Sequence, residues 1–217
     1  MRTRTGAWVP VALIGLALIP IVAGTSRLVE LAGGPHTLPA NPRIAASPAP
    51  VVVHIVSAIL YAILGALQFS SALRRRRPGW HRAAGRVLVV LGFAVAGSAL
   101  WMTQFYPYQE DTGALLYVFR LAFGSGMAAA IVLGFAAIRR RDIAGHRAWM
   151  TRAYALALGA GTQAFTQGIG ESLFGAGAPR TDLMLGAGWA INLAVAEYVI
   201  RRGRARTRGR SAARVTA

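Results

Sequence analysis

The chain of 217 residues is 55% hydrophobic and only 14% charged, whereas roughly a quarter of the residues in a soluble domain are charged. Its formal net charge of +17 comes from arginine alone, because the sequence has no lysine. The absence of cysteine excludes disulfides, thiolate metal sites, iron–sulfur clusters and thiol catalysis. Together these values predict one compact membrane domain without room for a second, soluble one.

Six apolar stretches have the length of about 20 residues that a helix needs to cross a bilayer. The first also resembles a secretory signal, but it is longer than a typical signal core and its cleavage pattern is poor, which favours a retained helix. The fifth, rich in Gly, Thr and Gln, is the weakest of the six. The expected spans are residues 7–26, 51–73, 86–106, 113–138, 148–169 and 183–200.

The distribution of arginine predicts the orientation of these spans. Arginines crowd the N-terminus, the second connection, the fourth connection and the tail, whereas the alternate connections carry few. Because basic loops stay in the cytoplasm, we expect a bacterial cytoplasmic membrane protein with both termini inside. Residues 1–202 would form the transmembrane domain, and residues 203–217 a disordered basic tail lying against anionic lipid. The basic segments contain Arg2, Arg4, Arg74, Arg75, Arg76, Arg77, Arg82, Arg86, Arg139, Arg140, Arg141, Arg147, Arg152 and the seven arginines from Arg201 to Arg214.

Two stretches of the chain echo one another. One is LGALQFSSALRRRRPGWHRAAGRVLVVLG, from Leu64, and the other is LGFAAIRRRDIAGHRAWMTRAYALALG, from Leu133. Each has an apolar helix end, an arginine run, a glycine and then His-Arg at the start of the next helix. The repeat predicts an all-α fold in which helices two to five form a central four-helix bundle of two similar hairpins, with helices one and six outside. The alternative is coincidence between two arginine-rich turns.

Longer stretches resemble the bacterial membrane-protein family catalogued as domain of unknown function 2306. The resemblance covers about three quarters of the chain and implies a multi-pass membrane protein without an established activity. The stretches that carry it are HIVSAILYAILGALQFSSALRRRRPGWHRAAGR from His54, LWMTQFYP from Leu100, LLYVFRLAFGSGMAAAIVLGFAAIRRRDIAGHRAWMTRAYALALGAGTQ from Leu115 and GAGWAINLAVAEYVIRR from Gly186.

Polar residues inside the expected spans suggest a first site, because each costs free energy in lipid unless it is paired. Helical spacing places them on single faces of helices two and five, with an arginine two turns into helix four. The topology brings them to similar depth near the outer leaflet, where an Arg120–Glu171 pair would fit. The alternative is that they only hydrogen-bond helices together. This outer polar cluster comprises His54, Tyr61, Arg120, Gln163, Gln167 and Glu171.

A second site is expected at the cytoplasmic face, where both repeats place histidine beside arginine. The charge there suits an anionic group such as a lipid phosphate. Asn192 and Glu197 of the sixth helix could pair with these arginines, Glu197 with Arg86 or Arg152. The alternative is that histidine and arginine act there only as interface anchors and helix caps. The expected inner site comprises His81, Arg82, Arg86, His146, Arg147 and Arg152.

Three function classes remain open. The first is a non-enzymatic scaffold or anionic-lipid-binding protein, which the arginines at the cytoplasmic ends of the spans favour. The second is a small-solute or proton transporter that uses the outer polar cluster. The third is a haem- or quinone-binding redox protein. Haem b would need His81 and His146 as ligands, yet both begin helices instead of lying inside an apolar pocket. No nucleotide-binding, metalloprotease or hydrolase motif appears, so no catalytic or metal residue is assigned. Arginines at the ends of spans favour lipid headgroups over nucleic acid as partners, and homo-oligomerisation stays open.

Overall fold

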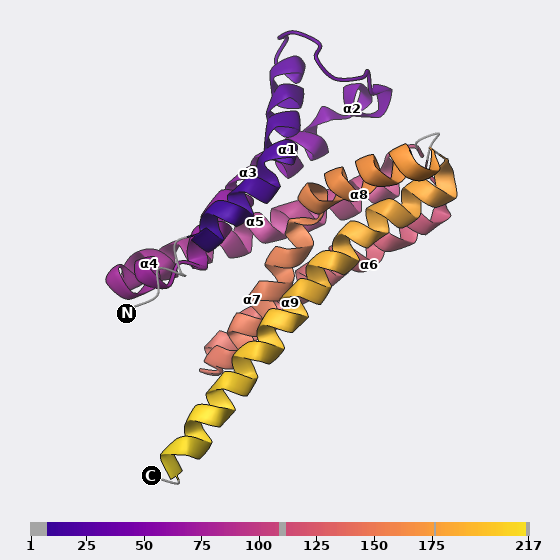
Figure 1. Cartoon of the computed structure of the whole chain (residues 1–217). Helices are drawn as coiled ribbons and strands as arrows, with labels where there is room; N and C mark the ends of the chain where they lie inside the picture. The colour runs from indigo at the N-terminus through magenta and orange to yellow at the C-terminus, as the bar shows by residue number, and fades with distance from the viewer. Residues whose placement is uncertain (1–7, 109–111, 176, 216–217) are drawn as a thin grey trace.

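The computed structural model describes residues 8–108, 112–175 and 177–215, with side chains as far as residue 205, and these ranges form helices and short connections (Figure 1). Arg2, Arg4, Glu110 and Asp111 lie outside the described residues. In chain order the helices are α1 (Trp8–Leu31), α2 (Pro42–Ala46), α3 (Pro48–Gln68), α4 (Ser71–Arg76), α5 (Pro78–Phe105), α6 (Ala114–Arg139), α7 (Ile143–Ala157), α8 (Gly159–Phe174) and α9 (Ala178–Val215).

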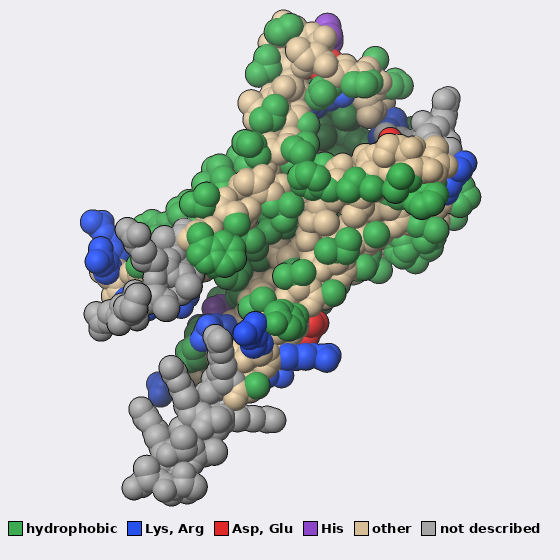
Figure 2. Space-filling view, viewed as in Figure 1, with side chains coloured by type: hydrophobic (Ala, Val, Ile, Leu, Met, Phe, Trp, Pro, Cys, Tyr) green, Lys and Arg blue, Asp and Glu red, His purple; other side chains and the backbone are tan. Residues whose placement is uncertain are grey.

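Five of these helices are long and apolar enough to cross a membrane: α1, α3, α5, α6 and the Ala178–Ala205 part of α9. Their outward faces carry large apolar side chains, with Val11 70% and Val90 69% exposed. Figure 2 shows such side chains over the middle of the visible face. A water-soluble surface rarely exposes apolar area on this scale, so the middle of the molecule is suited to lipid.

The expected span at 148–169 is divided between α7 and α8, and each part is shorter than a bilayer requires. The helix breaks at Leu158, whose ψ of 2° leaves the regular α conformation. Two glycines follow at places where other helices approach closely: a Cβ at Gly159 would collide with the Trp189 indole, and one at Gly161 with the Leu16 carbonyl of α1. Glycine weakens helix continuity, so the chain bends where α1 and α9 come nearest.

Other boundaries also differ from the expected ones. α5 begins at Pro78, because proline is well suited to the first helical turn, and therefore includes Arg86 within the helix. α3 ends at Gln68, and Ser70 then starts the separate helix α4 by accepting a hydrogen bond from the Leu73 N–H. α9 continues to Val215, through most of the tail that is expected from its sequence to be disordered. The arginine and alanine residues of this tail are strong helix formers.

The core lies among α3, α5, α6 and α7, which contact one another in a ring, with α1 packed on α3 and α8, and α9 packed on α6, α7 and α8. At its centre, a Cβ on Gly92 would lie 2.6 Å from Ile131 Cδ1 and 2.9 Å from Tyr61 Cε2. The Tyr61 ring also stacks on that of Tyr154, with 5.9 Å between centroids. Close packing of this kind fixes the four helices against one another.

The chain reversals gather at two opposite ends of the molecule (Figure 1). We call one the α2 end: it contains α2 and the described residues that follow α5 and α8 (106–108, 112–113, 175 and 177). The other is the arginine end, which contains α4, the first three turns of α5 and of α7, the α6–α7 turn and α9 from Ala196 onward. Figure 2 shows arginine side chains gathered toward the arginine end.

Candidate functional site

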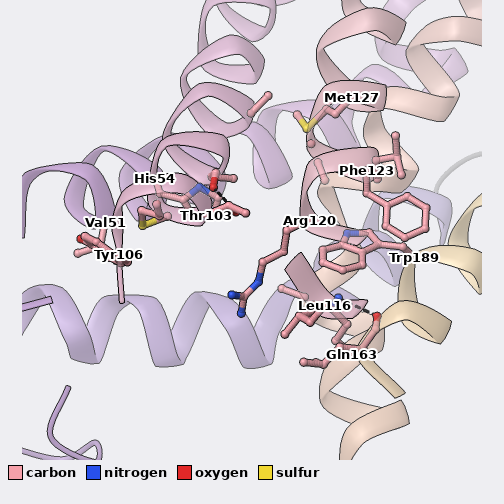
Figure 3. Close-up of a pocket in the computed structure, with 18 of the residues that line it drawn as sticks. Val51, His54, Thr103, Tyr106, Leu116, Arg120, Phe123, Met127, Gln163 and Trp189 are labelled. Carbon is pink, nitrogen blue, oxygen red and sulfur yellow. Dashed lines mark hydrogen bonds between the residues drawn. The ribbon is translucent and has the colours of Figure 1, made fainter. Parts of the chain in front are cut away.

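A cavity of about 360 Å³ lies toward the α2 end, among α2, α3, α5, α6, α7, α8 and α9 (Figure 3). This volume is at the lower end of the range of roughly 300–1,000 Å³ found for small-molecule sites. Polar groups reach it from Arg43, His54, Thr103, Arg120 and Gln163. The rest of the lining is mainly apolar or aromatic and includes Val51, Ala96, Met102, Tyr106, Leu116, Phe123, Met127, Leu156 and Trp189.

Arg120 is the central charge of this cavity. Figure 3 shows its side chain extending from α6 into the space between the His54 side and Trp189. No residue that the structure describes hydrogen-bonds or ion-pairs with its guanidinium; Arg43 and Asp182 are near enough for their charges to act on it. A cation held in a largely apolar space without a direct counter-charge is costly, so the cavity is suited to an anion.

Asp182 fixes the start of α6, the helix that carries Arg120. It is only 1% exposed, and its carboxylate accepts hydrogen bonds from Gly113 N at 2.9 and 3.1 Å and from Leu116 N at 3.1 Å. These N–H groups belong to the N-cap residue and the first turn of α6, so Asp182 caps that helix from α9. The carboxylate is thereby committed to the backbone, which leaves Arg120 without an ion pair.

The hydrogen bonds of His54 determine which ring nitrogen is free. Its Nδ1 lies 3.2 Å from the Val95 carbonyl and 3.1 Å from Ser98 Oγ, and the Ser98 hydroxyl donates to the Ala94 carbonyl at 2.5 Å. Because a carbonyl can only accept, Nδ1 carries the hydrogen and donates it. In the neutral ring, Nε2 is then an available acceptor in the cavity that His54 lines.

Hydrogen bonds hold the connection between α1 and α3, which includes α2, beside the cavity. Arg43 Nη1 donates to the Pro107 carbonyl at 3.1 Å, and the guanidinium lies 5.8 Å from the Tyr106 ring centroid. The Tyr106 hydroxyl in turn donates to the Ser47 carbonyl at 2.5 Å. Burial lowers the pKa of Arg43 and raises that of Tyr106. These bonds hold α2 against the α5–α6 connection, so a second arginine stays beside the cavity.

The break between α7 and α8 lies beside the cavity and is bridged by one side chain of α9. Asn192 Nδ2 donates to the Ala155 carbonyl at 3.1 Å, and its Oδ1 accepts from Thr162 Oγ1 at 2.7 Å. Backbone groups freed by a helix break inside a membrane need such partners. Gln163, the next residue of α8, donates from its Nε2 to the Leu185 carbonyl at 2.9 Å, which holds this cavity residue in place.

The structure brings together half of the expected outer polar cluster. His54, Arg120 and Gln163 line the cavity, whereas Tyr61 lies deeper in the core. Gln167 and Glu171 lie outside the lining and bond to each other within α8, Gln167 Nε2 to Glu171 Oε1 at 2.7 Å. The expected Arg120–Glu171 pair is therefore not formed among the described residues. The reason is that α9, carrying Asp182, adjoins the start of α6.

The residues of the expected inner site also fall into separate groups: some pair or approach one another, and others are exposed. Arg152 binds Glu197 with both ends of its guanidinium, at 2.5 Å for Nε–Oε1 and 3.1 Å for Nη2–Oε2, which confirms one of the pairs proposed for Glu197. Asn192 was expected to pair with an arginine, and that expectation is wrong because it bridges α7 and α8. His81 and His146 come within electrostatic range of each other, and the exposed members of the expected set are Arg82, Arg86 and Arg147.

Several residues in or near the cavity were not predicted from the sequence, because they come from α2 and α9 and meet the other helices only in the folded structure. Arg43 and Asp182 appear in the sequence only as loop charges, and Trp189 as one apolar residue of a span. A Thr-Asp pair just before an apolar helix is typical of a helix start, which is a weak signal for Asp182. That its carboxylate caps α6 depends on tertiary contacts.

Comparison with known proteins identifies the family. The family described as "Predicted membrane protein (DUF2306)" matches residues 51–200. This range includes most of the core, both arginine-rich turns and all the cavity residues except Arg43 and Ile44. No curated protein and no solved structure matches the chain significantly. With its five spanning-length helices, the chain is a multi-pass membrane protein and belongs to the DUF2306 family.

Proposed function

We propose that this protein binds a small amphipathic anion in the cavity at the α2 end. One observation carries the proposal: the Arg120 guanidinium extends into a mainly apolar cavity and has no hydrogen bond or ion pair with any described residue. An arginine in that setting recognises a carboxylate or similar oxyanion by charge-assisted hydrogen bonds. The apolar and aromatic walls would hold the remainder of the ligand.

The orientation that fits the arginine distribution places this cavity in the outer half of the membrane. The arginine end carries most of the basic residues and would face the cytoplasm, with both termini there. α7 and α8 together would then form a sixth, discontinuous span, and the two similar hairpins would run in the same direction. A broken helix beside a ligand site is a recurring arrangement in membrane proteins, because the break exposes polar groups where a ligand can use them.

The chemistry of the lining defines the class of ligand further. Arg120 supplies donors for an acid group, and the neutral His54 supplies Nε2 as an acceptor for a ligand hydroxyl. Phe123 and Trp189, whose ring centroids lie 5.0 Å apart, supply an aromatic wall. We therefore expect a monocarboxylic acid with a compact aromatic or aliphatic body, and a hydroxyl group on that body should strengthen binding.

Binding fits this conformation better than free permeation. On the side toward the arginine end, Tyr61, Gly92 and Ile131 close-pack below the cavity. Carrier action is the second candidate, favoured by the α7–α8 break, at which the lining could move. It predicts uptake of the same acids into proteoliposomes, and ligand binding without any uptake would exclude it.

The test uses 4-bromobenzoate, whose bromine quenches tryptophan fluorescence, and its methyl ester, which has the same ring without the charge. We expect saturable quenching by the acid in the detergent-purified protein, little by the ester, and loss of the saturable part in Trp189→Phe. Equal quenching by acid and ester, or quenching that persists in Trp189→Phe, would show that the probe enters the micelle and not the cavity.

A further inference from the structure

The arginine end brings together cations from both halves of the repeat. His81 of α5 lies within electrostatic range of Arg74 in α4 and of His146 in α7. Arg74 lies within range of Arg147 as well, and its pKa is lowered by burial first and then by Arg147 and Arg75. Four potential cations from three helices therefore surround one region at this end.

The acidic residues of this end, Asp142 and Glu197, bind other groups and not the four cations. Asp142, in the α6–α7 turn, accepts the Gly145 N–H at 2.8 Å and so caps α7. Glu197 is bound by Arg152. Within the described part of the chain, no ion pair reaches Arg74 or Arg147. The cluster thus has an excess of positive charge that its own carboxylates do not neutralise.

The same region contains two buried side-chain nitrogens without hydrogen-bond partners among the described residues, His81 Nδ1 and Gln68 Nε2. Both adjoin Arg74, whose Nη1 donates to the Gln68 carbonyl at 3.2 Å. Leaving a buried polar atom without a hydrogen bond costs about 1–3 kcal/mol, so almost all such atoms have a partner in the protein, in water or in a ligand. The amide nitrogen of Gln68, the ring nitrogen of His81 and the guanidinium of Arg74 can all donate to one multivalent acceptor.

The two related histidines differ in this respect. His146 Nδ1 lies 2.9 Å from the Gly134 carbonyl and is satisfied within the protein. His81, at the corresponding place in the first hairpin, has no such partner for its Nδ1. If the repeat only reproduced interface anchors, both histidines would be satisfied in the same way. An external hydrogen-bond acceptor is therefore needed by His81, on the α4–α5 side, and not by His146.

We propose that the arginine end binds the phosphate of one anionic membrane lipid between α4, α5 and α7, through Arg74, Arg147, His81 and Gln68. A phosphodiester offers several acceptor oxygens and one negative charge to this set of donors. A lipid is the source because the cluster terminates apolar spans: the Val87 and Val90 side chains of α5 are 50% and 69% exposed, and lipid tails can lie along them. The Trp149 ring under Arg152, 4.5 Å from its guanidinium carbon, is typical of the headgroup level.

The experiment compares two double variants with the same loss of charge. Arg74→Gln with Arg147→Gln removes the donors of the site, whereas Arg75→Gln with Arg76→Gln removes exposed arginines of the same helix. Purified full-length protein is titrated with dioleoyl phosphatidylglycerol or dioleoyl phosphatidylcholine, and bound lipid is measured by native mass spectrometry. We expect one phosphatidylglycerol to bind preferentially, at least about tenfold more weakly in the first double variant and within about twofold of the parent in the second.

A third variant and a competitor complete the test. His81→Phe fills the histidine position without a donor and should weaken phosphatidylglycerol binding several-fold while the melting temperature stays within the range of the Arg75/Arg76 control. Equal binding by both double variants would overturn the proposal, because it would reduce the effect to general charge attraction. Displacement of the lipid by inorganic phosphate would overturn the assignment to a lipid and indicate a soluble phosphate instead.

Discussion

The α2 end and the arginine end use charge in different ways. At the α2 end, Asp182 is 1% exposed and accepts three hydrogen bonds from backbone N–H groups, and Arg120 lines a mainly apolar cavity. At the arginine end, most arginines are exposed, and the described ion pair there, Arg152–Glu197, has side chains 21% and 34% exposed. Asp182 and Arg120 at the first end are at least partly removed from water, whereas most charges at the second end are exposed to it.

This difference has an energetic consequence. An exposed ion pair is screened by water and salt and contributes little to stability, typically up to about 1 kcal/mol. A buried carboxylate that satisfies backbone donors contributes more, because its removal leaves those donors without partners. The sequence, which shows only the type and position of each charge, does not distinguish the two cases. Variants at each end should separate them.

The largest effect is expected at Asp182. Replacement by alanine leaves the N–H groups of Gly113 and Leu116 unsatisfied in a buried position, and should lower the free energy of unfolding by about 2–3 kcal/mol. Asp182→Asn, which keeps one acceptor oxygen, should lose about half as much. Reversible unfolding in mixed detergent, followed by circular dichroism, measures both. A loss below about 0.5 kcal/mol for the alanine variant would show that α6 does not depend on this cap.

An intermediate effect is expected at the α7–α8 break. Asn192→Ala removes both hydrogen bonds that bridge it and should cost about 1 kcal/mol, within the range measured for side-chain hydrogen bonds between membrane helices. Thr162→Val removes one of the two and serves as the matched control, with a smaller loss. Because Gln163 follows Thr162 directly, Asn192→Ala should also weaken binding of 4-bromobenzoate. Unchanged stability together with unchanged binding would mean that the break holds its shape without the Asn192 bridge.

The smallest effect is expected at the arginine end. Glu197→Gln breaks the ion pair with Arg152, which is partly exposed, and should cost no more than about 1 kcal/mol. The cost should shrink further in high salt, whereas that of Asp182→Ala should not, because only the exposed pair is screened. Unfolding measured at low and high salt checks this. A loss for Glu197→Gln as large as that for Asp182→Ala would remove the energetic distinction between the two ends.

Much of the architecture could be predicted from the sequence, because spanning length and apolar composition are local properties. The start of α5 at Pro78 and the break at Leu158 were missed, since the first depends on proline in the opening turn and the second on contacts with Leu16 and Trp189. The number of spans, the repeat and the orientation in the membrane stay predictions.

The candidate cavity was predicted in part. Helical spacing identified His54 and Gln163, and its depth in an apolar span identified Arg120, because polar residues within apolar spans are visible in any sequence. Depth alone suggested Glu171 as the partner of Arg120, but neighbouring helices determine which side chains meet. The contribution of Asp182 depends on α9 lying against the start of α6, and no local pattern encodes that contact.

Arg120 is the residue on which the proposed anion site depends most. The most direct test of this dependence is the dissociation constant of 4-bromobenzoate, from Trp189 quenching, for the parent protein and for Arg120→Gln. The matched control is Arg86→Gln, which removes an exposed arginine at the opposite end. We expect at least about tenfold weaker binding for Arg120→Gln, or about 1.4 kcal/mol, and parental affinity for Arg86→Gln. Parental affinity in a well-folded Arg120→Gln protein would contradict the proposed role of Arg120.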